Sequence, residues 1–201
     1  MEVDENPGPG TRFTRRSATF IGTFTFVARI VERLGAFGQI ALIASVYGSS
    51  YVADRYFIAS IAPLIIGAIA GEAFSANILP ALVRSDDEQG LVSAGFWLAT
   101  ALMVVVTGCY LAVSAAVVGG YSPAGSHDLR VWFAFAPVGA FLGISGYLAG
   151  VLTYFERYVW PPFRSAVSTA AGFAATGVVL IFTRDLFWVG AAVTFGYALS
   201  W

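Results

Sequence analysis

Three charged residues lie close together inside the first long apolar stretch of the chain. They are Arg29, Glu32 and Arg33. In a helix that rises about 1.5 Å per residue they lie roughly 20 Å beyond Arg16, too far along to reach the near surface easily. Their spacings of three and four residues place them on one face, so that Glu32 can pair with both arginines. One carboxylate between two guanidinium groups leaves one positive charge, which an anionic headgroup can offset.

The position of these charges predicts a cavity. A charged side chain at the centre of a bilayer costs about 2.5 to 3.5 kcal/mol on insertion scales, so this face should point into a helical bundle or toward water. We interpret Arg29, Glu32 and Arg33 as a substrate-binding site for an anion. Two structural alternatives stay open: an ion-pair cluster that only orients helix packing, or a first segment that lies partly in the membrane interface.

Further polar residues lie in or near the second apolar stretch. Glu72 is a second charge inside the membrane, and its expected partner is Arg29 or Arg33 on the neighbouring helix, or a proton. Helix pairing and ion or proton coupling therefore both stay open for Glu72. Asn77 is expected to form a hydrogen bond to another helix. Asp54 lies at a tight turn, where a solvated or helix-end role is the default and a coupling role the alternative.

Composition places the chain in a membrane and narrows the classes of function. Hydrophobic residues make up 58% of the 201 residues and charged residues only 11%, and the mean hydropathy is +0.76. A water-soluble surface needs far more charge than this. The net charge of -1 argues against a nucleic-acid partner, which needs a basic face. No phosphate-binding loop, metal pair or nucleophile with its base can be assembled, so we expect neither enzymatic activity nor a cofactor or metal.

Long apolar stretches separated by short polar connections predict an all-α polytopic membrane protein with a bundle of about six transmembrane helices. A span of a hydrocarbon layer about 30 Å thick needs roughly 20 helical residues. The stretches do not alternate in polarity as barrel strands do. Residues 1–16 are expected to be a disordered tail. The six expected helices cover residues 17–46, 55–83, 91–118, 131–155, 158–182 and 186–201, and the last looks truncated because it has no terminal polar cap.

The distribution of arginine predicts the orientation. Cytoplasmic connections of membrane proteins carry an excess of basic residues. One set of alternate connections holds Arg12, Arg15, Arg16, Arg84, Arg157 and Arg164, and the other holds Arg55, Arg130 and Arg184. The amino terminus is therefore predicted to be cytoplasmic.

Three segments resemble a known family. Residues 47–59 (YGSSYVADRYFIA), residues 72–80 (EAFSANILP) and residues 154–162 (YFERYVWPP) are similar in order and character to the helix ends of MviN/MurJ-type lipid II flippases. The wider group is the multidrug/oligosaccharidyl-lipid/polysaccharide (MOP) flippase superfamily. The resemblance covers nearly the whole chain in helix order.

This resemblance implies the amino-terminal lobe of a fourteen-helix transporter in the bacterial cytoplasmic membrane. Such a transporter moves a polyprenyl-pyrophosphate-linked saccharide, such as a peptidoglycan precursor for the cell wall, outward by alternating access. The family's first-helix arginines bind the pyrophosphate, and Arg33, followed by Leu34 and Gly35, is similar to one of them. The implied partners are the lipid-linked anionic substrate, membrane lipids and a second helical lobe. The alternatives are a cation-coupled multidrug exporter of the same superfamily and a membrane assembly subunit that transports nothing.

Overall fold

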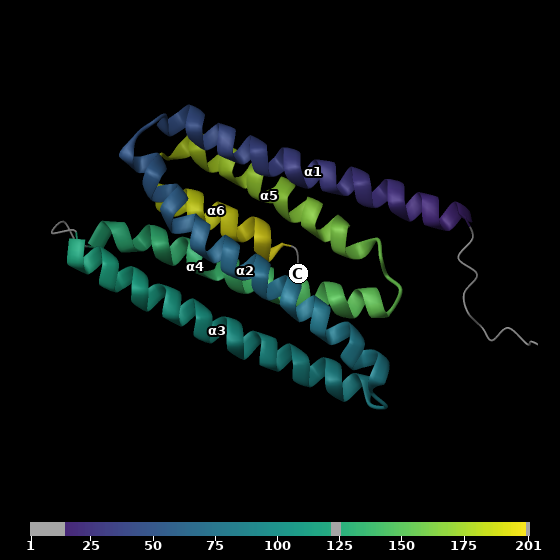
Figure 1. The fold of residues 1–201 in the computed structure, drawn as a ribbon. Coiled ribbons are helices and arrows are strands. Elements are labelled where there is room, and N and C mark those ends of the chain that lie inside the picture. Colours follow the sequence, from purple (N-terminus) through teal and green to yellow (C-terminus); the bar gives the residue numbers. More distant parts are fainter. Residues whose placement is uncertain (1–14, 122–125, 200–201) are drawn as a thin grey trace, which may run out of the picture.

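The computed structural model of the chain describes residues 15–121 and 126–199, with side chains for residues 19–118 and 129–199. These residues form helices and no strand, which confirms the predicted all-α membrane bundle. The helices are α1 Arg15–Tyr47, α2 Tyr51–Arg84, α3 Glu88–Tyr121, α4 Ser126–Tyr154, α5 Trp160–Phe182 and α6 Leu186–Ala198 (Figure 1). Most of the predicted tail lies outside the described residues, and α1 already begins at Arg15.

Short polar motifs end one helix and begin the next. Gly48 adopts a left-handed conformation (φ 61°), and its amide donates to the Ala44 carbonyl at 2.8 Å, which closes α1. The Asp87 carboxylate accepts from the Gly90 amide at 2.9 Å at the start of α3. Asp185 caps α6 in the same way, by accepting from an amide in its first turn. The connections are therefore tight, and helices that are consecutive in sequence run antiparallel (Figure 1).

Four helices, α2 to α5, are long and apolar enough to cross a membrane. Their outer surfaces carry large apolar side chains that water would not tolerate in such number: Leu98 is 70% exposed, Ile181 79% and Phe182 82%. Helix α1 is 33 residues long but carries the three central charges, and α6 has only 13 residues. Membrane crossing by α1 and α6 stays a prediction.

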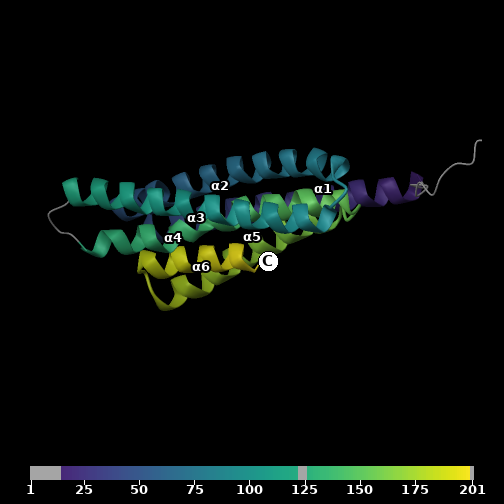
Figure 2. The same cartoon turned by 90° about the horizontal axis from the view of Figure 1, so that it is seen from below.

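The helices associate in two groups. Helix α4 packs against α2, α3 and α6, whereas α5 packs between α1 and α6. Helices α1 and α2 follow each other in sequence but barely touch. In Figure 1, α1 and α5 lie side by side along one edge, and Figure 2 shows α2 and α6 on opposite sides of α4. The contact between α4 and α6 therefore joins the two groups.

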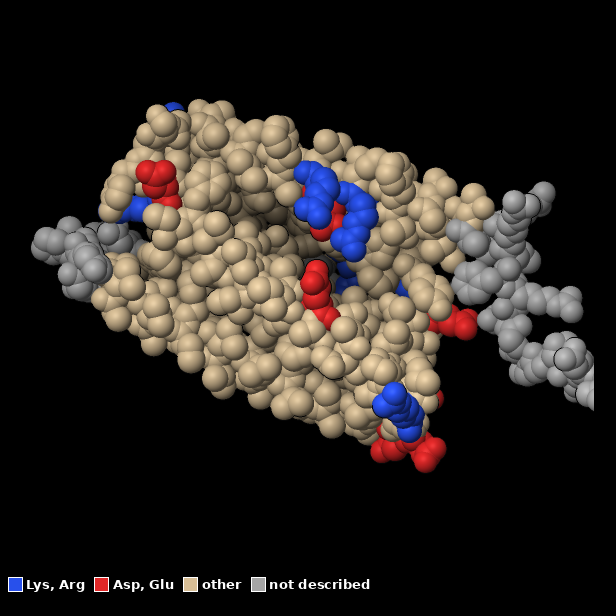
Figure 3. Space-filling model, viewed as in Figure 1, with Lys and Arg blue, Asp and Glu red and all other residues tan. Residues whose placement is uncertain are grey.

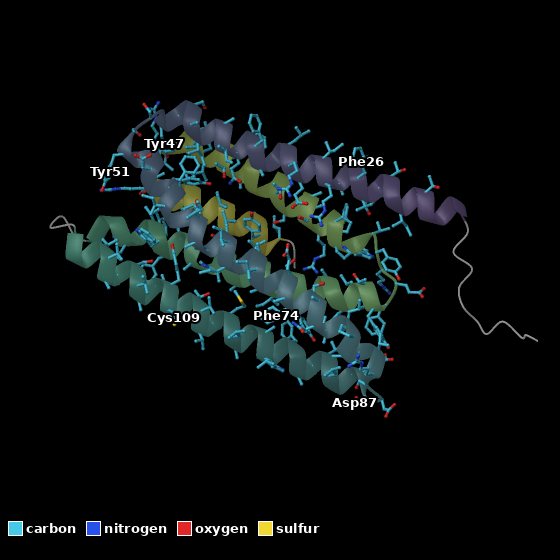
Figure 4. All side chains as sticks on the ribbon, viewed as in Figure 1. Phe26, Tyr47, Tyr51, Phe74, Asp87 and Cys109 are labelled. Carbon is cyan, nitrogen blue, oxygen red and sulfur yellow. The ribbon has the colours of Figure 1, made fainter. Side chains whose placement is uncertain are left out.

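The apolar core closes one end of the bundle more than the other. A cluster around Ile43, Tyr56, Phe135 and Val189 joins α1, α2, α4 and α6 near the α1–α2 connection. Figure 4 labels Tyr47 and Tyr51 at this closed end and Asp87 at the opposite end. A second cluster near the opposite end joins only α2, α3 and α4. The two groups of helices are therefore less tightly joined at the end where α1 begins.

This less tightly joined end is also rich in arginine. It holds the start of α1, the α2–α3 connection and the α4–α5 connection (Figure 1). Arg84 and Arg157 lie at these connections, and Arg164 lies one turn into α5. Arg12 lies outside the described residues. We call this end of the bundle the arginine-rich end.

Glycines allow α2 and α4 to touch backbone to backbone. A Cβ atom built on Gly67 would lie 2.7 Å from the Gly139 carbonyl oxygen, and one on Gly146 would clash with the backbone of Gly71. No side chain fits into contacts this close, so only glycine permits them. The result is the most extensive helix pair in the bundle.

A tyrosine on α3 donates a hydrogen bond to a carbonyl of α2 that a proline leaves without its backbone donor. Pro63 has no amide hydrogen, so it cannot donate to the Ala59 carbonyl one turn earlier. The Tyr110 hydroxyl donates to that carbonyl instead, at 2.8 Å, and Ala59 is fully buried. Lipid offers no hydrogen bond to an orphaned carbonyl, so this interhelical bond stabilises both the kinked helix and the α2–α3 contact.

Replacing Tyr110 with phenylalanine is expected to lower the free energy of unfolding by about 1 to 3 kcal/mol, the cost of a buried acceptor without a partner. The ring and its packing against Trp132 are retained. Reversible unfolding in mixed micelles measures the change. Tyr51→Phe is the matched control, because Tyr51 is exposed and its ring contact with Arg55 does not need the hydroxyl. Equal effects of the two substitutions would contradict the role given to the Tyr110 hydroxyl.

Candidate functional site

The predicted charge cluster lies in the middle of α1, but its pairing is simpler than expected. Arg29 Nη1 donates to Glu32 Oε2 at 2.7 Å, with the side chains 58% and 21% exposed. Glu32 does not pair with Arg33, so the predicted double ion pair is wrong in its second half. The reason is geometric: residues three apart face each other on a helix, whereas adjacent residues point about 100° apart. Arg33 is exposed and makes no ion pair or hydrogen bond to any described residue.

A cavity of about 270 Å³ begins one turn beyond the cluster. Its walls come from four helices, and its α1 wall is formed by Ala36, Gln39 and Ile40. Tyr56 and Ser60 of α2 and Tyr197 of α6 add the other polar groups, and the remaining lining is apolar. The Gln39 amide also donates to the Thr176 hydroxyl at 3.2 Å, which ties α1 to α5 at this level.

Glu32 is the less exposed partner of the ion pair. Its side chain is 21% exposed, against 58% for Arg29. Glu32 lies two helical turns before Gln39, so it shares a face of α1 with this residue of the cavity wall. The carboxylate therefore holds Arg29 on the face of α1 that continues into the cavity.

The surface around the cluster is hollowed. Figure 3 shows basic side chains over α1 beside a hollow, and an acidic side chain over α2 on the other side of it. Away from this hollow, the visible face is almost free of charge until the two ends of the bundle. The charges therefore gather where helices α1 and α2 separate, which is where the core leaves the bundle open.

The residues predicted on α2 make none of the expected interhelical contacts. Glu72 is exposed and forms no ion pair with Arg29 or Arg33, because α1 packs on α5 and hardly touches α2. Asn77 donates to the Ala73 carbonyl of its own helix at 2.7 Å, so the predicted interhelical bond is wrong. Asp54 is exposed in the first turn of α2, where a carboxylate favours the helix dipole.

The residues that sequence reasoning missed are aromatic and amide side chains of the cavity wall. Tyr56 and Tyr197 carry no signal of their own in an apolar helix, because tyrosine is common in membrane helices. Gln39 had one usable sign: it is seven residues from Glu32, and hence on the same helix face. Among the described residues, no group of three His, Cys, Asp or Glu side chains could hold a metal ion.

A second cavity, of about 310 Å³, contains two arginines that were assigned only to helix ends. Arg157 and Arg164 line it together with Leu152, Trp160, Phe163, Val167 and Leu199. The turn before α5 positions Arg157: Glu156 is left-handed (φ 59°), and the Arg157 amide donates to the Leu152 carbonyl at 2.9 Å. This is a Schellman closure of α4, which folds the chain back into α5. Arg164 is half-buried.

No family model, curated protein or solved structure matches the chain. Membership of the MviN/MurJ-type family therefore stays a prediction based on the three motif segments. The bundle, the charge cluster and the two cavities of this chain are therefore the basis for its proposed function.

Proposed function

We propose that this chain is a lobe of a membrane transporter that carries a polyprenyl-pyrophosphate-linked saccharide across the bacterial cytoplasmic membrane. The observation that carries the proposal is the excess positive charge on α1 beside a cavity. Arg29 is neutralised by Glu32, and Arg33 is left without an ion pair among the described residues. An unpaired guanidinium in a membrane helix is costly, and an anionic cargo would offset that cost.

A pyrophosphate matches the chemistry of the cluster. Guanidinium groups bind phosphate oxygens with two parallel hydrogen bonds, which a lysine cannot do. The N–H donors of the Arg33 guanidinium are available to the pyrophosphate. Arg29 has further N–H donors besides the Nη1 donor that contacts Glu32 at 2.7 Å. In this proposal Glu32 orients Arg29, and the two arginines attract the pyrophosphate. The polar wall of Gln39, Tyr56 and Tyr197 receives hydroxyl groups of the saccharide.

The shape of the bundle supports loading from the arginine-rich end. The core cluster near the α1–α2 connection closes one end, and α1 separates from α2 toward the other. The excess of arginine at this open end supports a cytoplasmic orientation for it. Alternating access then requires the open and closed ends to exchange, with a second helical lobe rocking against this one. The second lobe is part of the proposal.

Replacing Arg33 with alanine tests the proposal directly. Transport of a fluorescent polyprenyl-pyrophosphate saccharide, measured with the full-length protein in proteoliposomes, is expected to fall at least about tenfold, the value of one charge-assisted contact. Arg33→Lys should recover only part of the loss, because the bidentate geometry is missing. Arg130→Ala is the matched control, because Arg130 is an exposed arginine at the closed end. Full transport by Arg33→Ala would refute the proposal.

A cation-coupled multidrug exporter is the second candidate, and the exposed carboxylate of Glu72 favours it. Glu72 has no ion pair with any described residue, so it is available to a cation or a proton. This candidate predicts that Glu72→Gln abolishes export of a cationic amphiphile while Arg33→Ala leaves it intact. The flippase proposal predicts that Arg33→Ala lowers transport of the lipid-linked saccharide while Glu72→Gln leaves it intact. A membrane assembly subunit would show neither effect.

A further inference from the structure

Two adjacent cavities are lined by none of the three residues of the α1 charge cluster, and one of them is charged whereas the other is apolar. The first holds Arg157 and Arg164 at the arginine-rich end. The second, of about 260 Å³, lies between α1 and α5 and is lined only by apolar residues and alanines. Phe163 and Val167 line both cavities, so the two are adjacent. A charged chamber thus continues into an apolar groove.

The charged chamber is suited to an anion. Two guanidinium groups line it, and the described residues of its wall include no acidic side chain. Arg164 also lies near the amino-terminal end of α5, where the helix dipole is positive and the first turn carries no acidic residue. The helix dipole adds to the positive potential of the two guanidinium groups, so the arrangement favours a negatively charged ligand. Phosphate is the anion that arginine pairs bind best.

The groove is suited to a hydrocarbon chain. It is formed by Phe24, Val27, Ala28 and Val31 on α1 and by Ala166 and Ala170 on α5, besides the two shared residues. The small side chains of α5 leave the space open. Aromatic rings connect the two cavities: Trp160 and Phe163 are 5.9 Å apart between centroids, and Phe163 and Phe24 are 6.3 Å apart. Trp160 marks the level of the lipid headgroups.

We propose that these two cavities bind an anionic phospholipid of the surrounding membrane. Its phosphate contacts Arg157 and Arg164, and one acyl chain lies in the groove between α1 and α5. The charge complementarity of the chamber, the apolar groove joined to it and the position at the arginine-rich end together select this occupant. The site uses none of the residues assigned to the transported substrate, and it does not rest on the proposed function.

Native mass spectrometry of the purified full chain in micelles tests the site with phosphatidylglycerol as the probe. One phosphatidylglycerol is expected to be retained in preference to phosphatidylcholine with the same chains. Arg157→Gln should weaken its binding about tenfold, and Arg157→Gln with Arg164→Gln about a hundredfold. Arg130→Gln with Arg184→Gln, which removes two exposed arginines at the closed end, should leave binding unchanged.

A substitution in the apolar groove tests the site without changing its charge or the turn that holds Arg157. Ala170→Trp fills the groove and should weaken long-chain phosphatidylglycerol about tenfold while leaving both arginines in place. Glycerol phosphate, the head without chains, should not compete at the concentration at which the lipid saturates. Three results would each overturn the proposal. They are unchanged retention of phosphatidylglycerol by Arg157→Gln, retention of phosphatidylcholine equal to that of phosphatidylglycerol, and full competition by glycerol phosphate. Arg33→Ala should retain the lipid whatever its effect on transport.

Discussion

Replacing Gly146 with leucine is expected to lower the free energy of unfolding by about 3 kcal/mol or more, because the new side chain has no space between α2 and α4. A Cβ atom on Gly146 would already clash with the Gly71 backbone. Backbone atoms cannot rotate away as a side chain can, so the helices must separate. Their separation would break the largest contact in the bundle.

The matched control for this prediction is Gly108→Leu on α3. A Cβ atom on Gly108 meets nothing within 4 Å, and the residue is exposed in the same apolar setting. Leucine also favours a helix more than glycine does, so the control should be neutral or slightly stabilising. Unfolding in mixed micelles and the retention volume in size-exclusion chromatography measure both variants. Equal losses for Gly146→Leu and Gly108→Leu would show that the close approach of α2 and α4 is not what matters.

Replacing Glu32 with leucine is expected to destabilise the protein by about 1 kcal/mol, because Arg29 loses its partner carboxylate and the pair is partly exposed. Glu32 is the carboxylate that pairs with Arg29, at 2.7 Å, and its side chain is only 21% exposed. Its removal leaves two guanidinium groups, Arg29 and Arg33, on one helix without a carboxylate beside them. Reversible unfolding in mixed micelles gives the free energy.

A double-mutant cycle isolates the pair. Arg29→Leu together with Glu32→Leu should restore most of the lost stability, because an apolar pair often replaces a buried ion pair without cost. A double variant as unstable as Glu32→Leu alone would mean that Glu32 acts through another partner, for which Tyr197 is the candidate. A fully stable Glu32→Leu would mean that water already neutralises the cluster.

Arg33→Leu separates a binding role from a structural role. Because Arg33 has no ion pair among the described residues, its replacement by the apolar leucine should raise the free energy of unfolding. Transport should nevertheless fall, as for Arg33→Ala. A residue that only orients helix packing would lower stability and transport together when it is removed. A gain in stability together with a loss of transport would therefore indicate that Arg33 binds a ligand.

Much of the fold could be predicted from the amino-acid sequence because helix formation in a membrane is a local matter. Apolar stretches of about 20 residues must satisfy their own backbone groups, so they become helices wherever they pack. The spacing of Arg29 and Glu32 likewise brought them onto one face before any tertiary contact was known. The expected end of the first helix at residue 46 and the expected start of the last at residue 186 lie within one residue of the observed bounds, because Gly48 and Asp185 act locally at these ends.

Only the tertiary structure decided which helices became neighbours. Helix α1 packs on α5 instead of α2, because Gly35 and Gly38 let Thr169 and Phe173 of α5 approach closely. Glu72 consequently has no arginine beside it, although adjacent helices in sequence made that pairing the natural expectation. Asn77 turned to its own backbone for a related reason: its side chain lies exposed, away from any helix it could bond.

The sequence by itself determined that this chain is helical, that it belongs in a membrane and that positive charge lies in the middle of its first helix. The structure alone decided that Glu32 pairs with one arginine and not two, and that cavities lie beside the cluster and at the arginine-rich end. The physical reason is the range of the interactions. Helix formation and charge spacing act within one or two turns, whereas cavities depend on side chains that are distant in sequence and meet only when small residues let the helices pack.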